Sequence, residues 1–245
     1  MKHLTSTDEK PSIAEDNFTL FMMKLCPYCT RVEIAFNLFG FKYDKVYISL
    51  KDKPSWFISL YPQGKVPFLM RGNEKMADSM SIVDYLSKNS EKLKDFSEAR
   101  VEESNSLISQ ISSPFHKIVF EKTFSDDDKI AAISVLKKIE ESIQGEYFEG
   151  STISKSDIIL FCHLNFFEVL LSRLLEIPAN KVTENFPNSI DDYEFKKISK
   201  YLNSMRNHPA VNSCGVRVSS LKIFADSCVD GSPNFDIAFQ PQGDC

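Results

Sequence analysis

The sequence predicts two folded parts, an α/β domain over residues 17–90 and an all-helical domain over residues 100–226. Three observations lead to this prediction. Short apolar runs alternate with amphipathic runs in the first part, helical periodicity dominates the second, and a charged connector, residues 91–99, separates the two patterns. The chain of 245 residues, 42% apolar and 26% charged, is long enough to build two hydrophobic cores.

The first domain follows the order strand, helix, strand, helix, strand, strand, helix. Residues 17–23 (NFTLFMM) are short and apolar, which is typical of a strand, and residues 27–39 carry an apolar helical face. Pro27 suits the first turn of that helix and Gly40 the position after its end. The remaining elements are a strand over 42–48, a helix within 52–61, strands within 63–70 and 74–77, and a helix within 77–88. A strand–helix–strand opening implies a parallel pair, and the whole order is the thioredoxin-like arrangement, βαβαββα.

The second domain is predicted to be a helical bundle. The stretch SKSD, residues 154–157, is a capping box in which Ser154 caps a helix and Asp157 returns the bond. That helix is apolar nearly all round, which is typical of the buried centre of a bundle. Residues 1–16 are predicted to be a flexible N-terminal extension and residues 227–245 a loose C-terminal tail. The helix candidates are 98–121 (bent near Pro114), 126–145, 155–176, 190–206 and 216–226.

Charge and hydropathy argue against several classes of partner. The net charge of −5 offers no electrostatic reason to bind nucleic acid or an anionic membrane. The polar, partly acidic N-terminus lacks the apolar segment of a secretory signal. The longest apolar run, residues 158–175, contains His163, Asn165, Glu168 and Arg173, so no stable membrane insertion is expected. We therefore expect a soluble, cytoplasmic protein with reduced thiols.

The stretch CPYC, residues 26–29, carries the strongest chemical signal. Cys26 is predicted to precede a helix, where unpaired backbone N–H groups and the helix dipole favour its thiolate. Cys29 follows one turn later on the same face, from which it can attack a mixed disulfide at Cys26. Half of a zinc site and two inert buried thiols are the alternatives. Because the other cysteines and the histidines are scattered, zinc lacks ligands, no metal is expected, and thiol chemistry is favoured.

Five stretches, CPYCTR, KPSWF, GKVPFL, ADSMSIVDYL and SKSD, together resemble a glutathione transferase, most similar to the omega class. The resemblance implies a glutathione transferase fold with glutathione in a cleft between the two domains, and a homodimer. It implies that Pro67 is cis and that the Val66 backbone bonds the cysteinyl part of glutathione. Asp78 and Ser79 would hold the γ-glutamyl end, and Lys53 the glycine carboxylate. From the residues alone, Asp78 and Ser79 could instead cap a helix and Lys53 could be a solvated surface charge.

The sequence departs from the omega pattern at Cys29, where that class usually has an apolar residue; CPYC is the glutaredoxin form. We therefore expect a glutathione-dependent thiol transferase in which Cys26 is the nucleophile and Cys29 opens a dithiol route. Glutathione would be a co-substrate, and small disulfides, glutathionylated thiols or dehydroascorbate the other substrates. Two alternatives on the same fold are a protein that resembles the intracellular chloride channels and a non-catalytic ligand carrier. The charges of Lys24, Arg31 and Glu33 disfavour the first, and only the abundance of Phe supports the second.

Overall fold

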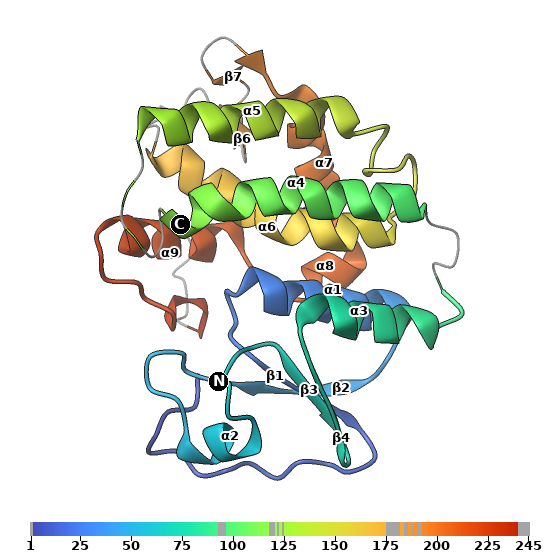
Figure 1. Ribbon diagram of the computed structural model, residues 1–245, viewed down its shortest axis with the longest axis vertical. Helices are drawn as coiled ribbons and strands as arrows, with labels where there is room; N and C mark the ends of the chain where they lie inside the picture. Colours follow the sequence, from blue (N-terminus) through green and yellow to red (C-terminus); the bar gives the residue numbers. More distant parts are fainter. Residues whose placement is uncertain are drawn as a thin grey trace. The chain divides into compact units, whose positions relative to one another are not determined.

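The computed structural model describes residues 2–92, 97–117, 121, 123, 125–174, 182–183, 186–187, 189–190 and 193–239 (Figure 1). The chain divides into two units. The first consists of Met1–Lys92 together with Phe235–Cys245, and the second of Leu93–Asn234. The expected connector, 91–99, and the expected tail, 227–245, lie partly outside the described residues, and the domain limits stay a prediction.

The first unit contains a four-stranded sheet in the order β2-β1-β3-β4. Strands β1 and β2 are parallel, whereas β3 pairs antiparallel with both β1 and β4. The predicted order βαβαββα and the thioredoxin-like fold are therefore confirmed. The elements are β1 (Phe18–Met22), α1 (Pro27–Phe39), β2 (Tyr43–Tyr47), α2 (Ser55–Leu60), β3 (Phe68–Arg71), β4 (Glu74–Ala77) and α3 (Ser79–Lys88).

Both faces of the sheet are covered, which explains why β1 is buried at every residue and apolar at every position except Thr19. Because side chains alternate along a strand, Phe21 and Phe18 point to opposite faces. Phe21 packs with Phe57 of α2, at 5.6 Å between ring centroids. Phe18 packs with Phe36 of α1, at 5.5 Å, and with Tyr85 of α3, at 6.2 Å. Figure 1 shows the result, with α2 on one side of the sheet and α1 and α3 on the other.

The second unit is built around α6 (Lys155–Leu174). The described residues of this helix are buried from Lys155 to Leu171, which confirms the predicted central helix. Helices α4 (Glu98–His116) and α9 (Val218–Val229) pack against it, and α5 (Asp126–Ser142) packs against α4. The other described elements are α7 (Lys196–Asn207), α8 (Pro209–Asn212) and two short antiparallel pairs, β5 (Val182–Thr183) with β6 (Phe186–Pro187) and β7 (Ser189–Ile190) with β8 (Tyr193–Glu194).

One predicted helix boundary is wrong. The helix expected over residues 190–206 begins at Lys196, and Ile190 belongs to a strand pair instead. The reason lies in another helix. The carboxylate of Glu140 on α5 accepts the backbone N–H groups of Lys197 and Ile198, each at 2.8 Å. The first turn of α7 is therefore capped by a residue more than fifty positions away, which local sequence signals do not reveal.

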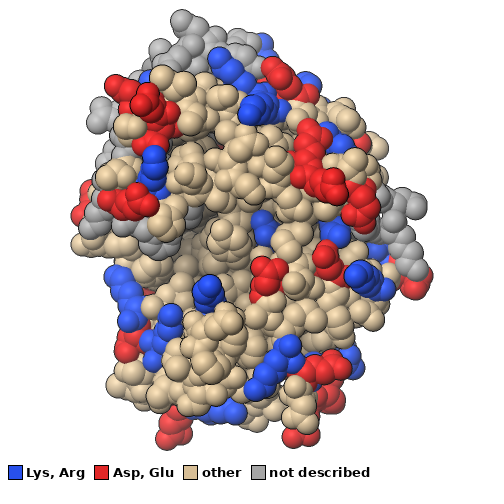
Figure 2. Space-filling model, in the orientation of Figure 1, with Lys and Arg blue, Asp and Glu red and all other residues tan. Residues whose placement is uncertain are grey.

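Parts of both chain ends have packed positions on the first unit. In the predicted extension, His3 is buried and Leu4 bridges to Ile48 next to β2. In the predicted tail, Ile237–Phe239 form a short 3₁₀ helix, η3, and the Phe239 ring packs on Tyr47, at 4.9 Å between centroids. Within the described part of the chain, every helix is either too short or too polar to cross a membrane. The face shown in Figure 2 carries acidic and basic side chains scattered over both units.

Candidate active site

Cys26 occupies the N-cap position of α1, directly after the turn that follows β1. Its backbone N–H donates to the carbonyl of Met23, at 3.1 Å, and its carbonyl accepts the N–H of Thr30, at 2.9 Å, which starts the helix. Pro27 takes the first helical position, where its missing N–H leaves no donor unpaired. The sulfur is therefore held against the positive end of α1, with 7% of the residue exposed.

The surroundings of Cys26 favour its thiolate. The pKa of this thiol is lowered chiefly by a hydrogen bond from the Cys29 thiol. The backbone N–H groups of Cys29 and Tyr28 and the charge of Arg31 lower it further, against the opposing effect of burial. Of the two cysteines, Cys26 is therefore the one that ionises more readily.

The surroundings of Cys29 favour the protonated thiol. It is 0% exposed, and burial together with the neighbouring Cys26 sulfur raises its pKa well above the usual value. The Met23 N–H donates to its sulfur at 3.5 Å. Cys29 therefore stays a protonated thiol that donates to Cys26, and the two cysteines divide the roles of thiolate and proton donor.

Arg31 is a site residue whose direction the sequence analysis could not determine. This buried side chain donates from Nη1 to the Ser79 Oγ, at 3.0 Å, so that one guanidinium joins α1 to the start of α3. It also lies over the Tyr28 ring, with Cζ 5.7 Å from the centroid. The available signal was an arginine within a helix that carries an apolar face, because a buried arginine is almost always paired.

Asp78 is the N-cap of α3 and has an unusual backbone conformation. Its φ is 73°, which is uncommon for a residue other than glycine. Its Oδ1 accepts the N–H groups of Met80, at 3.0 Å, and Ser81, at 2.9 Å. The second carboxylate oxygen, Oδ2, makes no hydrogen bond to any described residue. Asp78 therefore caps the helix, as the alternative interpretation of the sequence predicted, and it does so through Oδ1 alone.

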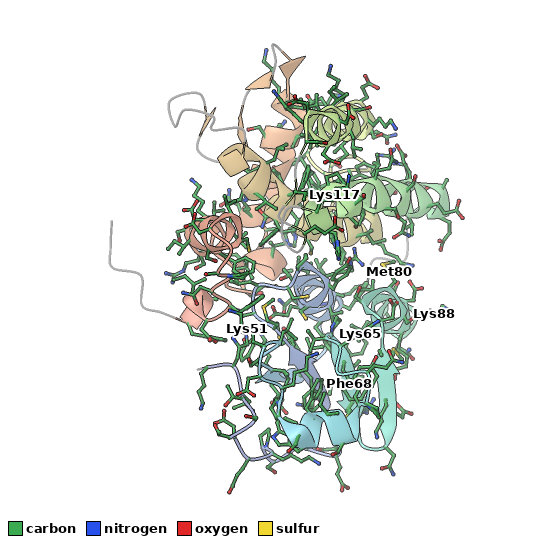
Figure 3. All side chains as sticks on the ribbon, turned by 60° about the vertical axis from the view of Figure 1, so that its left-hand side comes forward. Lys51, Lys65, Phe68, Met80, Lys88 and Lys117 are labelled. Carbon is green, nitrogen blue, oxygen red and sulfur yellow. The ribbon has the colours of Figure 1, made fainter. Side chains whose placement is uncertain are left out.

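The segment before β3 contains backbone groups that take no part in the sheet pairing. The Val66–Pro67 peptide bond is cis, as the resemblance implies. Val66 is half-buried, and among the described residues neither its N–H nor its carbonyl takes part in the sheet pairing. Lys53 is half-buried as well and lies over Gly64, since a Cβ built on that glycine would be 3.4 Å from the Lys53 Cδ. In Figure 3, Lys65 and Met80 mark the segments that contain Val66 and Ser79.

The structure thus brings several predicted site residues into one unit, around the start of α1, the start of α3 and the turn before β3. Among the described residues, no group of three or more His, Cys, Asp and Glu side chains is arranged to hold a metal ion. A cysteine with a lowered pKa at a helix N-terminus next to a thioredoxin-like sheet is the feature of this site that bears most directly on its chemistry.

Comparison with known proteins identifies the family. Residues 20–94 match the model of the glutathione S-transferase N-terminal domain. Glutathione S-transferase DHAR2 of Arabidopsis thaliana is 30% identical over 149 residues, which cover 60% of this chain and 68% of that protein. The chain therefore belongs to the glutathione S-transferase family.

Two further comparisons show how much of the chain is similar to known proteins. The pyrimidodiazepine synthase of Drosophila melanogaster is 34% identical over 90 residues, 35% of this chain, and the chain spans 37% of its length. The crystal structure of glutathione transferase Omega 1C from Trametes versicolor superposes with a TM-score of 0.68 at 18% identity, over 88% of this chain and 97% of that one. The overall fold predicted from the sequence is therefore confirmed.

Proposed function

We propose that this protein is a glutathione-dependent thiol transferase of the thioltransferase or dehydroascorbate reductase type. The observation that carries the proposal is the lowered pKa of Cys26, which receives hydrogen bonds from the Cys29 thiol and from two backbone N–H groups of α1. A thiol with a lowered pKa forms more of the thiolate that attacks disulfides, whereas conjugation of an electrophile requires the ionised sulfur to be on glutathione. The Arabidopsis relative named DHAR2 supports the same reading.

The proposed reaction has two halves. The Cys26 thiolate attacks the glutathione sulfur of a glutathionylated thiol; the mixed disulfide with glutathione forms, and the other thiol leaves as a thiolate that takes a proton from water. A second glutathione thiolate then attacks the glutathione sulfur of the mixed disulfide, which releases oxidised glutathione and restores the Cys26 thiolate. In the dithiol route, Cys29 attacks the Cys26 sulfur instead and expels glutathione.

Glutathione binding is proposed to use the residues around the starts of α1 and α3. The Ser79 hydroxyl, whose oxygen already accepts from Arg31, can still donate its proton to the α-carboxylate of the γ-glutamyl group. The unused oxygen of Asp78 suits the ammonium of the same group. The Val66 backbone suits the cysteinyl part, as an added strand would, and Lys53 suits the glycine carboxylate.

The first test is the glutathione-dependent reduction of a small mixed disulfide. Cys26→Ser should abolish turnover, because the nucleophile is lost. Cys29→Ser should retain activity toward glutathionylated substrates and lose it toward protein disulfides. Cys162→Ala, which removes a buried thiol of α6, is the control and should leave turnover unchanged. Full activity of Cys26→Ser would contradict the proposal.

Intact mass after incubation with oxidised glutathione gives an independent readout. One glutathione adduct is expected or, after attack by Cys29, a Cys26–Cys29 disulfide, and Cys26→Ser should show neither. The family resemblance also leads us to propose a homodimer, which light scattering after size-exclusion chromatography would test.

A further inference from the structure

One fully buried carboxylate of the first unit has no part in the reaction proposed above. Glu33 lies on α1 and is 0% exposed, and its Oε1 is 2.6 Å from the Lys45 Nζ on β2. Its Oε2 accepts no hydrogen bond from the described residues. A gain in stability from the ion pair is a weak explanation for the presence of a carboxylate in the core. Replacing a buried ion pair by apolar residues is often neutral or stabilising.

The position of Glu33 matches a requirement of the dithiol route. Cys29 must lose its proton before its sulfur can attack, yet it is 0% exposed and shut off from bulk water. Burial is the largest cause that raises the pKa of Cys29, and it still acts in the mixed disulfide, where the Cys26 sulfur no longer carries a charge; the negative charge of Glu33 adds to the shift. The attack therefore requires a base inside the protein.

The position of Glu33 on the helix and the raised pKa of its carboxyl group both suit it to be this base. It follows Cys29 by four residues on the same helix, a spacing that puts two side chains on one face within about 6 Å. Burial raises the pKa of Glu33, opposed by the charges of Lys24 and Lys45, so its carboxylate holds a proton better than an exposed one does. The side chain of Lys45 is 28% exposed, which gives the carboxylate a polar connection to the surface.

We propose that Glu33 accepts the proton of Cys29 in the resolving step of the dithiol route. This inference rests on the proposed function. The Glu33 carboxylate takes the proton from the Cys29 thiol, and the resulting thiolate attacks the Cys26 sulfur of the mixed disulfide. The bond between Cys26 and glutathione breaks, and glutathione leaves with the electron pair as a thiolate. The products are the Cys26–Cys29 disulfide, free glutathione and protonated Glu33, which passes its proton to water beside Lys45.

The resolving step can be measured alone. Protein carrying one glutathione on Cys26 is prepared with oxidised glutathione, excess reagent is removed, and the release of glutathione is followed by mass spectrometry. Glu33→Gln should slow this release by about a hundredfold, the usual contribution of a general base. Its rate should also rise continuously with pH, because hydroxide must then remove the Cys29 proton. Turnover with a second glutathione, which does not involve Cys29, should stay unchanged.

Lys45→Gln is the matched control, because it breaks the same ion pair and leaves the carboxylate in place. Retained release in Lys45→Gln with loss in Glu33→Gln supports a base, whereas equal losses in both variants would assign Glu33 a structural role and overturn the proposal. Release at the wild-type rate and with the wild-type pH profile in Glu33→Gln would also overturn it.

Two further measurements keep the proposal testable if Glu33→Gln fails to fold. Glu33→Asp keeps a carboxylate and should restore part of the rate. Infrared spectroscopy of the wild-type adduct during resolution should show a protonated buried carboxyl group, and its absence contradicts the inference. Failure of Cys26 to form either the adduct or the Cys26–Cys29 disulfide would instead refute the proposed function, so the two failures are distinguishable.

Discussion

Arg31 illustrates how one residue can contact both the proposed nucleophile and the proposed binding site. Its charge lowers the pKa of Cys26, although this effect is smaller than that of the Cys29 thiol and the backbone N–H groups. Its Nη1 at the same time donates to Ser79, the proposed partner of the γ-glutamyl carboxylate. A planar guanidinium with several donors can do both, whereas an ammonium supplies charge without the fixed geometry.

Two substitutions separate these roles. Arg31→Lys should keep the lowered pKa of Cys26 in part and raise the KM for glutathione about tenfold or more, because the bond that holds Ser79 is lost. Arg31→Met should raise the KM and also raise the pKa of Cys26. The pH dependence of iodoacetamide alkylation at Cys26 measures the second effect. Arg71→Met, at an exposed arginine of β3, is the control. Wild-type alkylation and KM in Arg31→Met would exclude both roles.

At the scale of elements, helix starts in the second unit are set in two different ways. Helix α5 begins with a local capping box, in which Ser125 and Asp128 satisfy each other's backbone N–H groups at 3.2 and 3.0 Å. At α6, the predicted return bond is present, from the Ser154 N–H to Asp157 at 2.7 Å. Asp157 also accepts the N–H of Phe148, at 2.8 Å, so it ties the helix to the preceding loop. This carboxylate is fully buried, whereas the α5 cap is exposed.

These two caps should differ in their contribution to stability. Asp157→Ala leaves two buried backbone N–H groups unpaired and should lower the free energy of unfolding by about 3 kcal/mol or more, since a hydrogen bond to a charged group contributes about 1.5–3 kcal/mol. Ser125→Ala should lower it by about 1 kcal/mol, the usual effect of losing an exposed cap. Urea denaturation followed by circular dichroism measures both values. Equal losses would show that burial does not strengthen the α6 cap.

At the scale of the whole molecule, residues from the two ends of the chain meet on the first unit. The His3 Nδ1 lies 2.6 Å from the Asp236 Oδ1, and its Nε2 accepts the backbone N–H of Lys24 at 3.1 Å. The His3 ring also packs edge-on against Phe239, at 4.8 Å between centroids. Because Lys24 lies two residues before Cys26, His3 connects Asp236 and Phe239 to the loop that precedes Cys26.

His3 should make stability depend on pH. Burial lowers its pKa, against the opposing effects of Asp236, so the folded protein favours the neutral ring. The unfolded chain takes up a proton at about pH 6.5, so the contribution of His3 is complete above that value and decreases as the pH falls. The stability advantage of the wild type over His3→Ala should therefore shrink between about pH 7.5 and about pH 5 in thermal melts. An advantage that does not change with pH would contradict this assignment.

Much of the fold was readable from local patterns. The apolar strand over residues 17–23, the helix that begins at Pro27 and ends at Gly40, and the apolar stretch after SKSD all have the predicted structure. These elements depend on periodicity, capping and turn residues that act over a few positions. The position of Cys26 at a helix start follows from the same local rules.

The protonation states and side-chain contacts of the site residues depend on the tertiary structure. The local sequence predicts an ionised Cys26 with Cys29 one turn away, but the burial and the contact with the Cys26 sulfur that raise the pKa of Cys29 come from the tertiary structure. Local sequence likewise does not reveal that Arg31 reaches Ser79, that Glu33 is buried beside Lys45, or that Glu140 caps α7. Each of these depends on side chains far apart in the chain and on exclusion of water, which raises the cost of an unpaired charge only once the core has formed.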